Sequence, residues 1–267
     1  MPELPEVETI VRHLHPALSS KKIIAADLRW ERTLVTPSVA TFQQQIVGQV
    51  IHQVTRRAKF IILQLTDFHL LIHLRMSGDL YIRDGLYQPG KHDRLLLLLS
   101  GDTVLVFNDP RKFGRIWLTR QPEEVLGKIG PEPLDPDFLV EAFVQRLRSR
   151  RRLLKPLLLD QSFLAGLGNI YTDEALHLAG LHPLMPSDQI SDRQAVRLFE
   201  SIRKVLQDGI AHNGASIDWV YRGGNFQNYF RVYNRAGQPC PVCGTPVERM
   251  VVGQRGTHFC PSCQVRG

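Results

Sequence analysis

The pattern of apolar positions in the first half of the chain predicts one helix followed by many short strands. Apolar residues at positions 7, 10, 11 and 14 recur at i, i+3, i+4 and i+7, which predicts a helix that starts at Glu6 and ends before Pro16. Runs typical of strands follow at residues 23–30, 47–55, 60–65, 70–74, 80–83, 94–99, 103–107 and 115–118. Ser100-Gly101-Asp102 indicates a hairpin between two of them. Many short strands with turn residues between them indicate a β-sandwich or barrel.

The pattern becomes helical after residues 130–136, which have the composition of a linker. Residues 138–147 are amphipathic, and residues 191–212 have the period of a long helix. Between these segments, two glycines allow a tight backbone, and Asn169 is a favourable N-cap for a helix that runs to about Ala179. Such a helix start can bind a phosphate, or it can simply be a capped helix.

Residues 216–229 contain glycine and asparagine and are expected to form a loop. Near the predicted helix start, Asp173 and Glu174 suit the helix dipole and need no further role. Together these patterns predict an α+β protein with three domains. They are a β-sandwich with an N-terminal helix at residues 1–130, a helical domain at residues 131–228, and a small ribbon at residues 229–267.

The ribbon contains all of the cysteines in the chain, arranged as C-x2-C, sixteen residues, and C-x2-C. This spacing fits a site in which four thiolates hold one zinc ion. Two disulfides are the alternative, and a reducing compartment argues against them. Proline and glycine residues around the cysteines supply the tight turns that such a site needs. The predicted ligands are Cys240, Cys243, Cys260 and Cys263.

Composition and charge indicate which classes of molecule the protein could bind. The chain has 267 residues and 43% hydrophobic content, which is ordinary for a globular protein. Its formal net charge of +7 favours nucleic acid or another anionic surface, although many basic proteins bind neither. No apolar run approaches the roughly 18–20 residues of a membrane span, and the N-terminus has no secretory signal. We therefore expect a cytoplasmic protein.

The first six residues, Met-Pro-Glu-Leu-Pro-Glu, combine an amine with two carboxylates. Removal of Met1 would leave Pro2 with a secondary amine, and because α-amino groups titrate at roughly 7.7–8.0, part of it would be neutral and nucleophilic. Attack on a carbonyl-like carbon gives an iminium ion, which makes the neighbouring C–H acidic. Of the nearby Glu3 and Glu6, one could hold a proton while the other stays ionised. The alternative is a frayed terminus with two solvated glutamates.

Three clusters of basic residues stand out. Residues 56–59 (Arg-Arg-Ala-Lys) enter a strand, so Arg57 and Lys59 are expected on one face. Residues 109–114 form a turn that carries Arg111 and Phe113. Either both side chains insert into a base stack, or Arg111 is solvated and Phe113 belongs to the core. The third cluster is a basic run that either binds phosphate or forms a solvated face. It consists of Arg146, Arg148, Arg150, Arg151, Arg152 and Lys155.

Taken together and in order, these motifs resemble bacterial formamidopyrimidine-DNA glycosylase, an enzyme that excises oxidised purines such as 8-oxoguanine. Each motif alone is modest, whereas the ordered set spans the whole chain and is specific. The resemblance rests on M-P-E-L-P-E at residues 1–6, R-R-A-K at 56–59, M-S-G at 76–78, D-P-R-K-F-G at 109–114, G-N-I-Y at 168–171 and the four cysteines.

The resemblance implies a β-sandwich, a helix–two-turns–helix domain and a zinc ribbon with one structural Zn²⁺. It implies that a monomer binds double-stranded DNA containing an oxidised base or an abasic site in the cleft between the two halves. It also implies base excision repair by a bifunctional glycosylase and AP lyase. Such an enzyme would work in the bacterial cytoplasm, associated with the nucleoid through its DNA.

Roles for individual residues follow from the same resemblance. Pro2 would be the nucleophile that forms a Schiff base at the sugar C1′, Glu3 the acid acting on the opening sugar, and Glu6 a supporting residue. Lys59 matches the lysine assigned to β-elimination and to a phosphate contact. Arg255 matches the ribbon arginine that clamps phosphate and is assigned to δ-elimination.

The resemblance also implies how the lesion is exposed. The target atom is buried in the base stack, so the nucleotide must be flipped out, and the gap needs an apolar wedge and a donor for the orphaned base. Met76 and Phe113 match the wedge, and Arg111 matches the donor. The other residues expected to bind DNA are His92, Lys112, Arg150 and Asn169.

Two features depart from the family pattern. Arg75 precedes Met76, where glycine is frequent, and residues 216–229 match poorly the loop that caps the extruded base. The enzymatic alternative is endonuclease VIII, which acts on pyrimidine lesions. Leu4, in place of the glycine usual in that enzyme, and the turn at residues 109–114 favour the purine enzyme.

The alternative from another class is a DNA-binding zinc protein without catalysis. Such a protein would keep Asn169, Arg255 and the cysteines. It would have no use for an intact Pro2-Glu3 terminus. The mass of the purified protein, which shows whether Met1 has been removed, distinguishes these alternatives at little cost.

Overall fold

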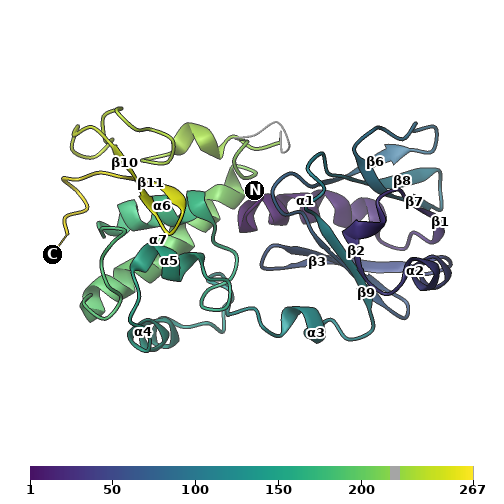
Figure 1. Ribbon diagram of the computed structural model, residues 1–267, viewed down its shortest axis with the longest axis horizontal. Helices are drawn as coiled ribbons and strands as arrows, with labels where there is room; N and C mark the ends of the chain where they lie inside the picture. The colour runs from purple at the N-terminus through teal and green to yellow at the C-terminus, as the bar shows by residue number, and fades with distance from the viewer. Residues whose placement is uncertain (217–222, 267) are drawn as a thin grey trace. The chain divides into compact units, whose positions relative to one another are not determined.

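The computed structural model describes residues 1–216 and 223–266 (Figure 1). Within these residues the chain divides into two compact units. The first contains residues 1–2, 6–127 and 216, and the second contains residues 3–5, 128–215 and 223–266. The division passes through the first turn of helix α1 (Leu4–Leu18), so the catalytic candidates at the N-terminus are shared between the units.

Helix α1 is longer than predicted at both ends. It begins two residues before Glu6 and continues through Pro16, so the prediction that it ends before the proline is wrong. Proline removes one backbone N–H from a helix, and the last turn here is held by packing instead. Leu14 and Leu18 are 3% and 0% exposed in the core of the first unit. The backbone N–H of Ser19 and its hydroxyl both donate to the carbonyl of His15.

Two sheets form the β-sandwich that the strand pattern indicated. The four-stranded antiparallel sheet has the order β1 (Ile23–Leu28), β7 (Asp93–Leu99), β8 (Thr103–Asn108) and β6 (Asp79–Asp84). The five-stranded sheet has the order β2 (Leu34–Thr36), β9 (Arg115–Thr119), β5 (His69–His73), β4 (Phe60–Leu65) and β3 (Ile51–Arg57), in which β2 runs parallel to β9. Apolar side chains from both sheets and from α1 share one buried core. The predicted hairpin at residues 100–102 joins β7 to β8.

Several short elements of the first unit were not predicted. They are the 3-10 turn η1 (Glu31–Thr33), strand β2, helix α2 (Val39–Ile46) and helix α3 (Glu123–Leu126). Helix α2 has an N-cap in the sequence, because the hydroxyl of Ser38 accepts a hydrogen bond from the backbone N–H of Thr41. Only Phe42 and Ile46 of this helix are buried, which is too few for a clear hydrophobic period.

The second unit is helical and carries a β-hairpin at its C-terminal end (Figure 1). Its helices are α4 (Val140–Arg148), α5 (Leu154–Leu159), α6 (Asn169–Ala179) and α7 (Asp192–Ala211), followed by the 3-10 turn η2 (Phe226–Tyr229). Helix α7 agrees with the predicted long helix, and Ser191 and Gln194 form a capping box at its start. Strands β10 (Glu248–Val252) and β11 (Arg255–Phe259) pair antiparallel.

The predicted loop at residues 216–229 is described only in part. Residues 217–222 lie outside the described residues, and residues 226–229 form η2 rather than loop. In the described part of the chain, none of the helices has the length and apolar character needed to cross a membrane.

Candidate active site and zinc ribbon

The carboxylate of Glu3 caps the N-terminus of helix α6. One oxygen accepts hydrogen bonds from the backbone N–H of Gly168 at 2.6 Å and of Tyr171 at 3.4 Å, and the other accepts from that of Ile170 at 2.9 Å. Glu3 is 2% exposed, so these donors replace water around a buried charge. The sequence left open whether this helix start binds a phosphate or is simply capped, and in the structure a carboxylate of the protein itself caps it.

The two glycines before α6 make this contact possible. A Cβ atom on Gly168 would lie 2.4 Å from the Cδ of Glu3, and one on Gly166 would lie 2.5 Å from a methyl carbon of Leu4. Gly166 also has a φ of +97°, a backbone conformation that favours glycine. In addition, the backbone N–H of Leu4 donates to the carbonyl of Gly166 at 3.0 Å. The N-terminal segment is thus locked against residues 166–171.

Asn169 does not cap α6, contrary to the prediction. Gly168 is the N-cap, and the side-chain amide of Asn169 donates to the carbonyl of Gly256 at 2.9 Å. Glu3 performs the capping that was assigned to Asn169. The asparagine instead connects the start of α6 to the β10–β11 hairpin.

The other catalytic candidates near the N-terminus are buried in the first unit. Pro2 is buried, and Glu6 and Lys59 are 2% and 4% exposed. The prediction that residues 56–59 enter a strand with alternating faces is wrong, because Arg57 pairs with Phe60 and residues 58–59 form the turn between β3 and β4. The turn requires a positive φ of 53° at Ala58. Lys59 therefore lies at a hairpin tip rather than on a strand face.

Asp109 and Ser77 join the two loops that carry the predicted wedge. The carboxylate of Asp109 accepts hydrogen bonds from the Ser77 hydroxyl and from the backbone N–H groups of Arg111 and Gly114. The Ser77 hydroxyl oxygen also accepts from the Arg111 N–H at 3.2 Å. Asp109 is fully buried, so these bonds compensate the burial of its charge. They bring Met76 into the same region as the 109–114 turn.

The side chains of that turn differ in their surroundings. Arg111 and Phe113 are exposed, and the guanidinium lies 5.0 Å from the centre of the phenyl ring. Of the two predicted alternatives, a core phenylalanine is excluded by the 47% exposure of Phe113. The ammonium of Lys112 lies 3.8 Å from the centre of the Trp30 ring, a cation–π contact. Lys112 thus has a partner within the protein.

His73 supports the backbone at Arg75, the residue before Met76 of the predicted wedge. Its Nδ1 accepts a hydrogen bond from the backbone N–H of Arg75 at 3.0 Å, and its ring packs edge-on against Phe60. Burial lowers the pKa of His73 to about 3, and the positive charges of Arg75 and Lys59 act in the same direction. The imidazole is therefore neutral and keeps the lone pair that holds Arg75 at a φ of +56°. Position 75 has the backbone conformation for which glycine is usual, and here it is stabilised by His73.

The basic run at residues 146–155 is mostly paired with neighbouring groups. Arg146 donates to the carbonyls of Ser162 and Phe163, and Arg148, Arg151 and Arg152 form ion pairs with Asp192, Asp188 and Asp160, respectively. Lys155 is fully buried against Asp173. The exposed Arg150 differs, because its side chain has no hydrogen bond or ion pair with the described residues. Among these six residues, Arg150 is the best candidate for a phosphate contact.

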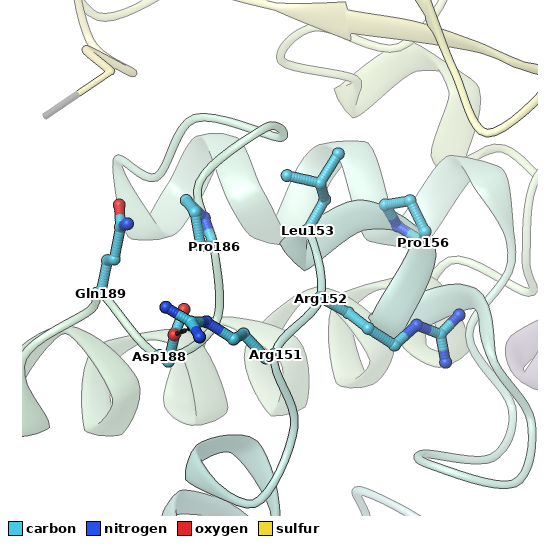
Figure 2. Close-up of a pocket in the computed structure, with 7 residues that line it drawn as sticks. All are labelled: Arg151, Arg152, Leu153, Pro156, Pro186, Asp188 and Gln189. Carbon is cyan, nitrogen blue, oxygen red and sulfur yellow. Dashed lines mark ion pairs between the residues drawn. The ribbon is translucent and has the colours of Figure 1, made fainter.

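A pocket of about 480 Å³ lies beside this run (Figure 2). Figure 2 shows Arg151 turned toward Asp188, with which it pairs, while the guanidinium of Arg152 points away from that pair. The rest of its lining is Leu153, Pro156, Pro186 and Gln189. None of the predicted site residues lines this pocket, so the pocket is separate from the candidate active site.

The four cysteines gather at one point of the ribbon. Their sulfur atoms lie within 4.8 Å of one another, and all four are free thiols, which rules out the disulfide alternative in this structure. Backbone N–H groups of Val242 and Cys263 point at the sulfurs of Cys240 and Cys260 at 3.5 and 3.4 Å. Such donors stabilise thiolates, and the set fits a closed tetrahedral zinc site. With four protein ligands there is no open position for a reacting water, so the zinc is structural.

Helix α6 fastens the ribbon through a buried ion pair. The ammonium of Lys155 lies 2.6 Å from a carboxylate oxygen of Asp173 and donates to the carbonyl of Gly256 at 3.1 Å. The other oxygen of Asp173 accepts from the backbone N–H of His258 at 2.9 Å. Burial lowers the pKa of Lys155, and the charge of Asp173 opposes that shift. These contacts hold β11 against α6.

Glu174, the next residue of α6, holds the segment that leads into the ribbon. Its carboxylate accepts the backbone N–H groups of Arg231, Val232 and Tyr233 at 2.8–2.9 Å. The prediction that Asp173 and Glu174 need no role beyond the helix dipole is therefore wrong. Both are buried, and each satisfies backbone groups of the ribbon or its connection. Arg255 is exposed at the start of β11, next to the hairpin turn.

Three family profiles match successive parts of this chain. They are described as the N-terminal domain of formamidopyrimidine-DNA glycosylase at residues 1–116, its H2TH domain at residues 129–220, and a zinc finger found in FPG and IleRS at residues 237–265. The matches follow the order of the sandwich, the helical part and the ribbon.

Curated relatives and solved structures agree along the full length. Formamidopyrimidine-DNA glycosylases of Chloroflexus aurantiacus and Protochlamydia amoebophila are 46% and 43% identical, with 99% of this chain covered and 98% and 99% of theirs. Two Lactococcus lactis Fpg structures, one with DNA containing N7-benzyl-Fapy-dG and one with DNA containing an abasic site, are each 38% identical. Their TM-scores are 0.94 and 0.93, and both cover 99% of this chain and 100% of theirs. Since the three profiles, the curated relatives and the solved structures all agree along the full length, the chain belongs to the formamidopyrimidine-DNA glycosylase family.

Proposed function

We propose that this protein excises oxidised purines, such as 8-oxoguanine and formamidopyrimidines, from double-stranded DNA and then cleaves the strand by β,δ-elimination. The observation that carries the proposal is the clamp on Glu3, in which three backbone N–H groups fix a buried carboxylate one residue after Pro2. The clamp fixes a buried carboxylate next to Pro2 in the chain, where a Schiff-base reaction at that amine needs a general acid. The family relation supports the same activity.

In the proposed reaction, Pro2 acts after Met1 has been removed. Its amine must lose a proton to become a nucleophile, and the neighbouring Glu3 carboxylate is a base that can accept it. Attack of the Pro2 nitrogen on C1′ forms the C–N bond as the bond to the damaged base breaks, and the departing base takes up the proton that remains on this nitrogen. Glu3 then returns the proton to the ring oxygen as the sugar opens, which leaves an iminium ion at C1′. We assign Glu6, buried one turn further along α1, to support of this site.

Strand cleavage follows from the electron demand of the iminium. It acidifies the C2′–H, so loss of that proton forms a C2′–C3′ double bond and expels the 3′-phosphate. Loss of the C4′ proton through the conjugated system then expels the 5′-phosphate. We assign Lys59 to the first elimination and to a phosphate contact, and Arg255 to a phosphate clamp and the second elimination. The position of each at a hairpin tip supports these assignments.

The wedge and the remaining cations would bind the duplex. We propose that Met76 and Phe113 fill the gap left by the extruded nucleotide and that Arg111 donates to its partner base. The exposed ring and guanidinium and the Asp109–Ser77 link support this assignment. Phosphate contacts are proposed for His92, Arg150 and Asn169, with Lys112 in a secondary role because of its contact with Trp30. Such an enzyme would be found at the bacterial nucleoid.

The function is tested with matched duplexes that carry 8-oxoguanine, an oxidised pyrimidine or no lesion. We expect base release and strand nicking with the 8-oxoguanine duplex and much slower reaction with the pyrimidine lesion. Faster reaction on the pyrimidine lesion would favour the endonuclease VIII alternative. Binding of lesion DNA with neither base release nor nicking would favour a non-catalytic zinc protein.

Glu3→Gln is expected to lower base excision at least about 100-fold, within the range that general acid–base catalysis contributes. An amide has only one oxygen, whereas both oxygens of Glu3 accept N–H groups, so one donor also loses its partner. Lesion-duplex binding should stay within a few-fold in an equilibrium assay. Glu174→Gln is a matched control, since that carboxylate also accepts three backbone N–H groups. Wild-type excision by Glu3→Gln would remove Glu3 from the chemistry.

Arg111→Ala is expected to weaken discrimination between cytosine and adenine opposite the lesion. Cytosine offers O2 and N3 acceptors to a guanidinium, and a good side-chain contact to a base contributes about 1–3 kcal/mol of discrimination. The measurement is the excision rate on duplexes that differ only in the opposite base. Lys112→Ala is the control from the same turn. If the opposite-base preference of Arg111→Ala is unchanged, Arg111 contacts only phosphate.

A further inference from the structure

His177 lies in the last turn of α6, where its ring meets the zinc ribbon. Its Nε2 is 3.3 Å from the sulfur of Cys240, and the side chain is nearly fully buried, with the whole residue 4% exposed. Its other nitrogen, Nδ1, is buried without a hydrogen-bond partner among the described residues. The sulfur is therefore the polar contact that the ring makes in the described part of the chain.

The geometry points to His177 as a positioning residue of the zinc site, with its Nε2–H donating a hydrogen bond to the Cys240 thiolate. Four thiolates on one Zn²⁺ leave a net charge of −2, and a donor near a sulfur spreads that charge. Both the imidazolium and the neutral tautomer protonated at Nε2 present a hydrogen on this nitrogen. Outer donors of this kind fix a ligand in place and strengthen metal binding.

His177 is not a fifth ligand in this arrangement. The cysteines already provide the four sulfurs of a tetrahedral site, and they lie within 4.8 Å of one another without the imidazole. Cys240 also receives the backbone N–H of Val242 at 3.5 Å. His177 therefore adds a second donor to this sulfur, and this donor comes from a helix outside the ribbon.

The contact completes a row of attachments along α6. Asp173 holds the backbone of β11, Glu174 holds residues 231–233, and His177 reaches the cysteine sulfur itself. Because the first two attachments remain when His177 is changed, the ribbon should stay docked in a variant. The effect of the substitution is then expected at the metal rather than on the fold.

The test compares His177→Phe, which keeps a ring and removes the donor, with His177→Gln, which keeps an N–H donor. Competition with a chromogenic chelator should show zinc affinity about 10- to 100-fold lower in His177→Phe and within a few-fold of wild type in His177→Gln. In the cobalt-substituted proteins, the sulfur-to-metal charge-transfer band should move to lower energy in His177→Phe. His182→Phe is a matched control, because His182 packs against Phe259 and has no hydrogen bond to a cysteine sulfur among the described residues.

Unchanged zinc affinity and an unchanged cobalt spectrum in His177→Phe would overturn the proposal, because the ring would then only fill space. If His177→Phe does not fold, NMR of the wild-type zinc protein decides the question through long-range ¹H–¹⁵N correlations of the imidazole. A proton on Nε2 of His177 supports the proposal. A ring protonated only at Nδ1 contradicts it.

Discussion

Protein that retains Met1 is expected to form no borohydride-trapped complex with 8-oxoguanine DNA, whereas protein that begins at Pro2 should form one. With Met1 in place, the Pro2 nitrogen is part of an amide and has no lone pair available for attack. An iminium requires an amine at that position, so base excision through the Schiff base and strand cleavage should fall together to background. Intact mass identifies the two forms, and gel shift after reduction measures the trapped complex.

The residue that carries the covalent adduct identifies the nucleophile directly. Peptide mapping should place the reduced sugar on Pro2, and Pro2→Gly, which keeps a primary amine, should retain part of the activity. Lys59 is the matched alternative, because it is the amine assigned to the elimination step and is buried in the same unit. An adduct on Lys59 in the wild-type protein would show that the nucleophile has been assigned incorrectly. Lys59→Ala should lower activity more gradually and still permit trapping.

The fold could be predicted largely because its strands and long helices follow simple periods. The hairpin at residues 100–102, eight of the nine strands of the sandwich and the capped helix α7 each have local sequence signals. Helix α2 and strand β2 were missed because each buries few side chains. The extension of α1 through Pro16 also lacks a local signal, since it is stabilised by burial of the helix's own Leu14 and Leu18 in the core of the first unit.

The candidate site was predicted by motif, but the contacts that position it were not. Glu3 and residues 168–171 are distant in sequence, and no period or spacing indicates that the carboxylate caps that helix. The same is true of the Asp109–Ser77 hydrogen bond, which joins the two loops of the predicted wedge. A resemblance to a family indicates which residues are catalytic candidates. Which neighbouring groups position those residues depends on tertiary contacts that the sequence does not show. Asn169 shows the difference, because its local signal was that of an N-cap and its observed partner is Gly256.

Helix α6 explains how these contacts cooperate within the second unit. Its first turn binds Glu3, its middle binds Lys155 and the backbone of the ribbon, and its last turn reaches Cys240. Each of the polar side chains involved is buried, so removal of one partner leaves an uncompensated group. A change at the zinc end of α6 is therefore expected to disturb the β10–β11 hairpin first. The Gly256 carbonyl of this hairpin accepts hydrogen bonds from both Lys155 and Asn169.

Loss of zinc is expected to disorder the hairpin and remove most of the affinity for lesion DNA, while the β-sandwich stays folded. Among the described residues, the ribbon's own apolar cluster consists of Val232, Cys240, Val247 and Cys260, which is too small to be stable alone. Structural zinc contributes about 10–16 kcal/mol in comparable peptides, so most of the ribbon's folding free energy must come from the metal. Cys243→Ser should lose about one zinc per chain by elemental analysis. Calorimetry should still show the unfolding transition of the first unit.

Arg255→Ala separates the metal from the phosphate contact. Arg255 is exposed beside the hairpin turn and is not one of the four cysteines of the metal site, so the variant should keep its zinc. It should bind lesion DNA more weakly, and the slope of log affinity against log salt should become shallower by about 0.9, the change expected for one phosphate contact. Retained zinc together with full lesion-duplex affinity in Cys243→Ser would show that the cysteines do not form this site. An unchanged salt slope in Arg255→Ala would show that the hairpin does not reach phosphate through this side chain.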